Sequence, residues 1–210
     1  MATLTIKPTA AGNDVQIKSG DGNTTHATFG DTNNISMSTG SIASAVTGTL
    51  GSGIVFPAGH ILQVVSTTMT DVLSIAGANS YNDIAGLTAT ITPSFTSSKI
   101  LIMCDVAITN ASSNCYIALL RGSSFVGVGP SSGSRSRVSS SNFYNSGTNN
   151  LVGTSFQYLD SPSTTSATTY KLQSITDTSV ATYVNRTSGD ADAVYGVRSQ
   201  STITLMEVKG

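Results

Sequence analysis

Short runs of β-branched and aromatic residues fill the chain from residue 60 onward, and they constrain the fold more than any other feature. Nine such runs occur, each bounded by Gly, Pro, Ser, Asn or Asp: residues 60–69, 87–93, 99–108, 115–122, 124–129, 151–160, 168–176, 180–186 and 201–208. Val, Ile, Thr and Tyr favour the half-buried surface of a strand, and the section contains no convincing helical pattern. Nine short strands at this spacing predict an all-β fold, an antiparallel jelly roll or β-sandwich.

The last run, "STITLMEV" at 201–208, alternates cleanly between apolar and polar positions. One face would carry Ile203, Leu205 and Glu207, and the other Thr202, Thr204 and Met206. Strict alternation is typical of a strand in the middle of an antiparallel sheet with one wet face. We therefore expect the final strand to lie inside a sheet rather than at its edge.

The chain changes character near residue 54, because the apolar positions before it are sparse. They come singly or as doublets separated by turn residues: Leu4, Ile6, Val15, Ile17, Phe29, Ile35 and Met37. A two-stranded piece of this size is marginal alone in water, but three copies wound about one axis would bury these side chains together. The pattern predicts residues 1–54 as an N-terminal fibrous β-stem of intertwined short strands with a linker, residues 55–210 as the head, and a homotrimer.

Charge and hydropathy exclude several classes of protein. Charged residues are 10% of the chain, the formal net charge is −1, and no Lys or Arg occurs between Ser19 and Ser98. A nucleic-acid-binding protein would show clustered Lys and Arg. No apolar segment reaches 18 residues, so we expect no membrane insertion, and the start "MATLTIKP" does not resemble a secretory signal.

Catalytic chemistry is also missing from the sequence. Glu207 is the single Glu, the two histidines (His26 and His60) lie in different parts of the chain, and neither "GxSxG" nor "GxxxxGK[ST]" occurs. Asp190 and Asp192 in "SGDADAV" fit a solvated loop better than a calcium site. The sequence predicts that the protein is not an enzyme and has no cofactor and no metal.

The two cysteines, Cys104 and Cys115, lie in neighbouring runs joined by "TNASS". If these runs form a hairpin centred near Thr109 and Asn110, the two cysteines face each other at about 4.5–5.5 Å between Cβ atoms. A disulfide is then geometrically conceivable, but two reduced, buried thiols are the favoured reading.

Several longer motifs of the head resemble one known family. They are "ITPSFTSSKILI" (91–102), "ALLRGSSFVGVG" (118–129), "YLDSPSTTSATTYKLQ" (158–173), "YVNRT" (183–187) and "STITLMEV". In this order they resemble the C-terminal head domains of bacteriophage fibres and related virion appendages, which are similar to trimeric TNF/C1q-like jelly rolls. The match covers roughly 150 residues.

The resemblance implies a structural virion protein assembled in the host cytoplasm. It implies a homotrimeric tail fibre that binds a receptor on the host surface, a glycan or a protein, and that joins other virion structural proteins through its stem. A capsid-bound head fibre, or a decoration (cement) protein that stabilises the particle, is the alternative.

The motif residues also have a structural reading of their own. We expect Asp160 to accept hydrogen bonds from downstream backbone amides, and Pro162 to set a turn. Arg121 is expected to pair with an acidic neighbour, and Gly122, Gly127 and Gly129 to mark tight bends or close backbone approaches. In the resemblance, the "LLRG" and "LDSP" motifs each form a hairpin.

One loop, residues 129–150, stands out as a candidate for binding. It carries two of the five arginines, Arg135 and Arg137, beside the aromatic pair Phe143 and Tyr144. Binding residues collect in loops on rigid scaffolds, and arginine would meet the phosphate or carboxylate of a surface glycan. In the alternative reading, Arg137 belongs to a strand and Phe143 to the core.

Overall fold

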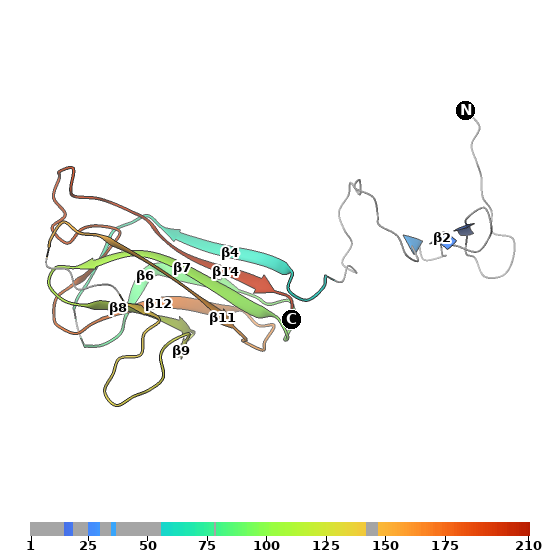
Figure 1. The fold of residues 1–210 in the computed structure, drawn as a ribbon, viewed down its shortest axis with the longest axis horizontal. Coiled ribbons are helices and arrows are strands. Elements are labelled where there is room, and N and C mark those ends of the chain that lie inside the picture. Colours follow the sequence, from blue (N-terminus) through green and yellow to red (C-terminus); the bar gives the residue numbers. More distant parts are fainter. Residues whose placement is uncertain (1–14, 19–24, 30–34, 37–55, 78, 142–146) are drawn as a thin grey trace. The chain divides into compact units, whose positions relative to one another are not determined.

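The computed structural model describes residues 15–18, 25–29, 35–36, 56–77, 79–141 and 147–210, with side chains from residue 56 onward. The chain forms two compact units, Met1–Ile54 and Val55–Gly210. Within the described residues, all regular structure is β-strand (Figure 1). The all-β prediction is confirmed for this part of the chain.

The N-terminal unit contains a small antiparallel sheet with the order β1-β2-β3. Its strands are β1 (Val15–Lys18), β2 (Thr25–Phe29) and β3 (Ile35–Ser36). Of the predicted stem core, Val15, Ile17, Phe29 and Ile35 lie on these strands, whereas Leu4, Ile6 and Met37 lie outside the described residues. The intertwined stem stays a prediction.

The second unit is built from the strands predicted for the head and two more. They are β4 (Ile61–Met69), β5 (Leu73–Ile75), β6 (Asn82–Ile91), β7 (Lys99–Asn110), β8 (Cys115–Arg121), β9 (Ser124–Val126), β10 (Ser140–Ser141), β11 (Val152–Asp160), β12 (Thr168–Thr176), β13 (Thr182–Val184) and β14 (Ser201–Val208). Each of the nine predicted runs overlaps one of these strands, although β6 begins before its run and β7 ends after its run. The two that were not predicted, β5 and β10, have 3 and 2 residues.

These strands form two antiparallel sheets that pack face to face (Figure 1). The five-stranded sheet has the order β10-β8-β12-β6, with β9 also paired to β8. In the six-stranded sheet the order is β4-β14-β7-β13-β5, and β11 pairs with the other side of β7. An antiparallel two-sheet sandwich results.

The core lies between the sheets and follows the alternation of the strands. On β14, Ile203, Leu205 and Glu207 are buried and the residues between them are partly exposed, as predicted. β14 lies between β4 and β7, inside its sheet. The largest fully buried apolar side chains are Leu87, Ile91, Ile100, Ile102, Ile108, Ile117, Leu119, Tyr170, Leu172, Ile203 and Leu205.

Two predicted hairpins are wrong. β7 and β8 belong to different sheets, so the segment between them crosses the sandwich, and so does the segment between β11 and β12. Cys104 therefore lies opposite Phe156 and Ile203, whereas Cys115 lies opposite Thr176. Both cysteines are free and buried, and burial raises the pKa of the Cys104 thiol to about 12. The reading as reduced thiols is the correct one.

The β8–β9 hairpin is confirmed, with Arg121 opposite Ser124. Gly122 has φ +59 in its turn, a value that favours glycine. Gly127 also has φ +59, and a Cβ there would lie 2.7 Å from the ring of Tyr158. At Gly129 neither a positive φ nor a close contact occurs, so that part of the prediction is wrong.

Candidate functional site

Residues from two of the recognised motifs meet at Asp160, at the end of β11. Its Oδ2 atom accepts hydrogen bonds from Arg121 Nη1 and from the Tyr170 hydroxyl, both at 2.7 Å. The ion pair predicted for Arg121 is confirmed, but the donors to Asp160 are side chains rather than the expected backbone amides. Tyr170 is fully buried, and burial, together with its hydrogen bond to Asp160, raises the pKa of the phenol.

A second convergence surrounds Glu207 on β14, which is fully buried. Its carboxylate accepts from the Ser98 hydroxyl (2.6 Å), the Gln63 amide (2.6 Å), and the backbone N–H (2.6 Å) and hydroxyl (3.0 Å) of Ser94. These bonds attach the β6–β7 connection to the last strand. Burial alone would raise the pKa of Glu207, but the hydrogen bonds outweigh it and lower the pKa below its ordinary value of 4.5.

We expect Glu207 to make the stability of the head depend on acid pH. A carboxylate with a lowered pKa in the folded state stabilises the fold above the unfolded-state pKa, about 4.3 for Glu, and loses this contribution as the pH falls through the folded-state pKa. Denaturant unfolding of the wild type and Glu207→Gln should therefore differ by a constant amount above about pH 5, and the difference should shrink below about pH 4. A difference that does not change between pH 7 and pH 3 would contradict this role.

Asn185, in "YVNRT", forms a third convergence. It is fully buried with φ +62, and its amide nitrogen donates to the carbonyls of Met69 (2.8 Å) and Asp71 (2.9 Å). Its amide oxygen accepts from the Ser201 hydroxyl at 2.6 Å, and that hydroxyl accepts from the N–H of Ala107 at 3.0 Å. One side chain thus joins β4, β7 and the start of β14.

Of the loop predicted to bind a receptor, the structure describes residues 129–141 and 147–150. Phe143 and Tyr144 lie outside the described residues. Residues 130–139 contain no strand, so the alternative reading of Arg137 as a strand residue is wrong. The loop is held by Tyr81, whose hydroxyl donates to the carbonyl of Arg137 and accepts from its N–H, both at 2.9 Å.

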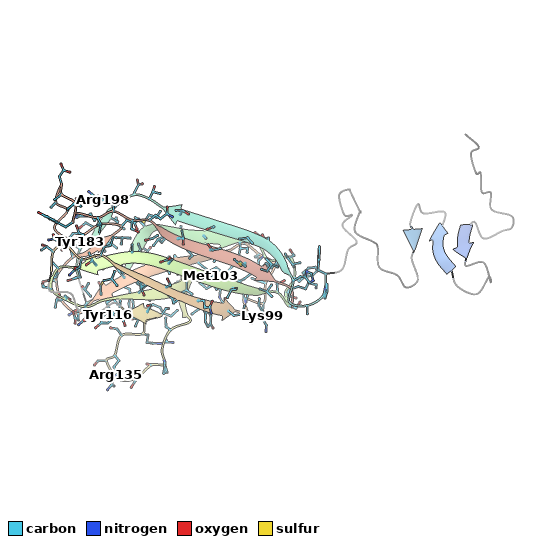
Figure 2. The ribbon with its side chains drawn as sticks, turned by 45° about the horizontal axis from the view of Figure 1, so that its top comes forward. Lys99, Met103, Tyr116, Arg135, Tyr183 and Arg198 are labelled. Carbon is cyan, nitrogen blue, oxygen red and sulfur yellow. The ribbon has the colours of Figure 1, made fainter. Side chains whose placement is uncertain are left out.

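The ring of Tyr81 is itself held in place by a neighbouring aromatic side chain. Its ring packs against Phe125 on β9, with 4.7 Å between the ring centroids. Further bonds join Ser139 N–H to the Ile117 carbonyl (2.7 Å) and Arg137 Nε to the Gly129 carbonyl (2.8 Å). These bonds attach residues 137–139 of the loop to the sandwich, and Figure 2 shows Arg135 standing away from the sheets.

A groove of about 510 Å³ lies beside this loop. It is lined by Asn79, Tyr116, Ser134, Arg135, Ser136, Val138, Ile175, Thr176 and Asp177. Four separate stretches of the chain build it: the segment before β6, strand β8, the loop, and the end of β12 with the residue that follows it. Tyr81, Tyr116 and Asp177 had no signal in the sequence that would have assigned them to such a site.

Asp177 is the carboxylate of this groove. It accepts from the Ser113 hydroxyl and from the Asn114 side-chain amide (2.8 Å), and these bonds lower its pKa. Burial, followed by the charge of Asp177, raises the pKa of the neighbouring Tyr116 phenol. At neutral pH the groove thus contains an ionised Asp177, a neutral phenol and the guanidinium of Arg135.

A second loop, residues 185–200, lies at the end of the sandwich marked by Tyr183 and Arg198 in Figure 2, with Lys99 at the opposite end. Asp190 pairs there with Arg186 (3.1 Å) and Arg198 (2.5 Å). Because the Asp190 carboxylate is already paired with two guanidiniums, the solvated-loop interpretation is favoured over a cation site. Val194 and Tyr195 are exposed, at 97% and 51%.

The outer face of the six-stranded sheet carries an apolar row that crosses four strands. The register aligns Val64 on β4, Met206 on β14, Leu101 on β7 and Leu159 on β11. Val64 is 55% exposed and Leu159 47%. We call this row, together with the neighbouring Met103, the apolar row.

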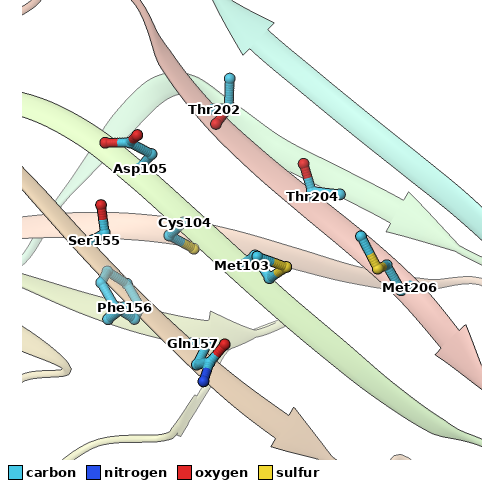
Figure 3. Close-up of a pocket in the computed structure, with 9 residues that line it drawn as sticks. All are labelled: Met103, Cys104, Asp105, Ser155, Phe156, Gln157, Thr202, Thr204 and Met206. Atoms are coloured by element: carbon cyan, nitrogen blue, oxygen red, sulfur yellow. The ribbon is translucent and has the colours of Figure 1, made fainter.

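A shallow hollow of about 570 Å³ adjoins the apolar row (Figure 3). Its lining is Met103, Cys104, Asp105, Ser155, Phe156, Gln157, Thr202, Thr204 and Met206. Asp105 is the single charged residue among them. The outer face of the other sheet is different, because Lys171 pairs there with Asp83 (2.9 Å), which also accepts from Gln173 (2.7 Å).

In the part of the chain that the structure describes, no helix is long and apolar enough to cross a membrane. Comparison of the sequence with models of known protein families gave no match. Comparison with curated proteins also gave none.

Proposed function

We propose that this chain is a homotrimeric virion fibre of a bacteriophage, with a head that binds the host surface and no enzymatic activity. One observation carries the proposal: the motif residues shared with phage fibre heads converge in space. Ser98 of "SSK" meets Glu207 of "MEV", and Arg121 of "LLRG" meets Asp160 and Tyr170 of the "LDSP" motif. Contacts between residues so distant in sequence hold the fold together, and their coincidence with the motifs supports the proposal.

The strand order supports a jelly roll within the sandwich. Eight strands pair as nested partners: β4 with β14, β6 with β12, β7 with β11, and β8 with β9. First pairs with last, second with seventh, third with sixth and fourth with fifth, as in one long hairpin rolled into two sheets. This is the arrangement expected of an eight-stranded jelly roll.

The apolar row is the surface through which the heads associate. Exposed contiguous apolar surface marks an interaction site, and interface cores are depleted in charged residues. The apolar row itself contains no charged residue, whereas the outer face of the other sheet carries the Lys171–Asp83 pair. In the proposed trimer each head is therefore covered at the apolar row and exposed to water on the other sheet.

A charge placed in the apolar row should separate the heads. Val64→Glu puts one carboxylate per chain on this face at a half-exposed position, where the isolated head tolerates it. We expect the mass in solution at micromolar concentration to fall from three chains towards one. The matched control, Ala85→Glu, places the same charge at an exposed position of β6 on the other sheet and should leave the mass unchanged. Equal masses for both variants would contradict this surface.

The location on the particle tests the function itself. Antibody to residues 56–210, applied to purified virions in the electron microscope, should label the tips of tail fibres. Label spread over the capsid would favour the alternative, a head fibre or cement protein, and unlabelled particles would refute a virion role.

A further inference from the structure

The groove beside the loop of residues 130–139 has a lining that indicates which chemical class of ligand it binds. This inference rests on the proposed function. Among the described arginines, three are paired with carboxylates: Arg121 with Asp160, and Arg186 and Arg198 with Asp190. Arg135 is not. Its hydrogen bonds go to the carbonyl and hydroxyl of Ser132, at 3.4 and 3.2 Å. An exposed guanidinium without a counter-ion, in a chain with 10% charged residues, is available for an anion.

The remaining lining suits a sugar. Tyr116 supplies an aromatic ring, which packs against the C–H face of a pyranose. Ser134 and Ser136 offer hydroxyls that both donate and accept, and the ionised Asp177 accepts from sugar hydroxyls. An aromatic surface with a few converging polar groups is the usual composition of a small-ligand site.

The charges also limit the anion. Arg135 and Asp177 line the same groove without forming an ion pair with each other. A singly charged carboxylate can bind the guanidinium fork with two parallel hydrogen bonds. A phosphate carries more negative charge and would meet stronger repulsion from Asp177.

The loop conformation is set before any ligand arrives. Tyr81 binds both backbone groups of Arg137, and Ser139 is bonded to the Ile117 carbonyl on β8. Because this holds Ser134–Ser136 over the groove, little conformational entropy is lost on binding. We propose that the groove binds one carboxylate-bearing sugar unit of an acidic bacterial surface polysaccharide.

The test uses the full chain and a panel of encapsulated bacterial strains with acidic capsules, each paired with its capsule-deficient mutant. We expect the chain to adhere to encapsulated cells and trigalacturonic acid to compete, whereas the methyl-esterified trisaccharide does not. Arg135→Gln and Tyr116→Leu should each weaken adhesion by about tenfold or more, since charge-assisted bonds and stacked rings contribute at that level. Lys99→Gln removes the same charge at the opposite end of the head and should have no effect.

The outcomes separate the groove from the proposed function. If the chain adheres but Arg135→Gln adheres equally well, or the esterified sugar competes equally, the groove assignment is overturned and the proposed function stands. If the chain adheres to no strain, the proposed binding to the host surface is wrong. The groove is then tested separately, by calorimetry of the chain with trigalacturonic acid. Binding that Arg135→Gln abolishes would then support the groove, and no binding would overturn it.

Discussion

Replacing Asn185 by Ala is expected to lower the free energy of unfolding of the head by about 3–4 kcal/mol, the largest effect of any single change considered. The substitution leaves the buried carbonyl of Met69 and the buried hydroxyl of Ser201 without this partner, and it also removes the bond to the carbonyl of the exposed Asp71. Each unsatisfied buried group costs about 1–3 kcal/mol. Alanine must also adopt φ +62, a conformation that costs residues other than glycine and asparagine about 1–2 kcal/mol. Urea unfolding monitored by circular dichroism measures the change.

Asn185→Gly separates the two causes. Glycine adopts the positive φ freely but, like alanine, lacks the side-chain amide. The glycine variant should therefore be more stable than the alanine variant by about 1 kcal/mol, and the rest of the loss is due to the missing hydrogen bonds. If the alanine variant is as stable as the wild type, the hydrogen bonds of Asn185 do not hold β4, β7 and β14 together as described.

Asp160→Ala is expected to destabilise the head by about 3 kcal/mol. The change leaves the fully buried Tyr170 hydroxyl without an acceptor and removes the partner of Arg121. The loss of a buried ionic partner costs about 3–5 kcal/mol. We expect the low end, because the Arg121 side chain is 34% exposed and can turn towards water.

A double-mutant cycle isolates the Tyr170 contribution. Tyr170→Phe removes the hydroxyl and keeps the ring. In the Asp160→Ala variant this hydroxyl has no acceptor, so its removal should lower the free energy of unfolding only slightly. The two changes should be non-additive by about 1–2 kcal/mol. Additive losses would show that the Asp160–Tyr170 bond does not contribute to stability.

The strands of the head were predictable because their signal is local. Alternation and β-branched composition report which residues face a core, and β14 shows this clearly: Ile203, Leu205 and Glu207 are buried as the pattern predicts. The short β5 and β10, with 3 and 2 residues, contain too few positions for a pattern to appear.

Pairing was not predictable from the same signal. The four residues between β7 and β8 have a length that serves either a hairpin or a crossing between sheets, and alternation does not distinguish the two. In such a hairpin Cys104 and Cys115 would face each other, but in the structure they lie in different sheets. Partners are decided by the packing of the whole sandwich.

The proposed binding groove was predictable only in part. A loop with two arginines is visible in the sequence, and Arg135 does line a groove. The sequence does not show that Tyr81 anchors this loop or that Tyr116 and Asp177 face it, because these residues come from three separate segments. The role of Asn185 was equally hidden, since it depends on carbonyls more than 110 residues away.

The central claim is that three copies of this chain form one fibre. It is tested most directly by the mass of the purified full chain in solution, measured by light scattering or sedimentation equilibrium at micromolar concentration. One chain has a mass of 21.5 kDa. The proposal predicts about three times this value, independent of dilution through the low-micromolar range. A mass of one chain would contradict both the trimeric stem and the association of the heads through the apolar row.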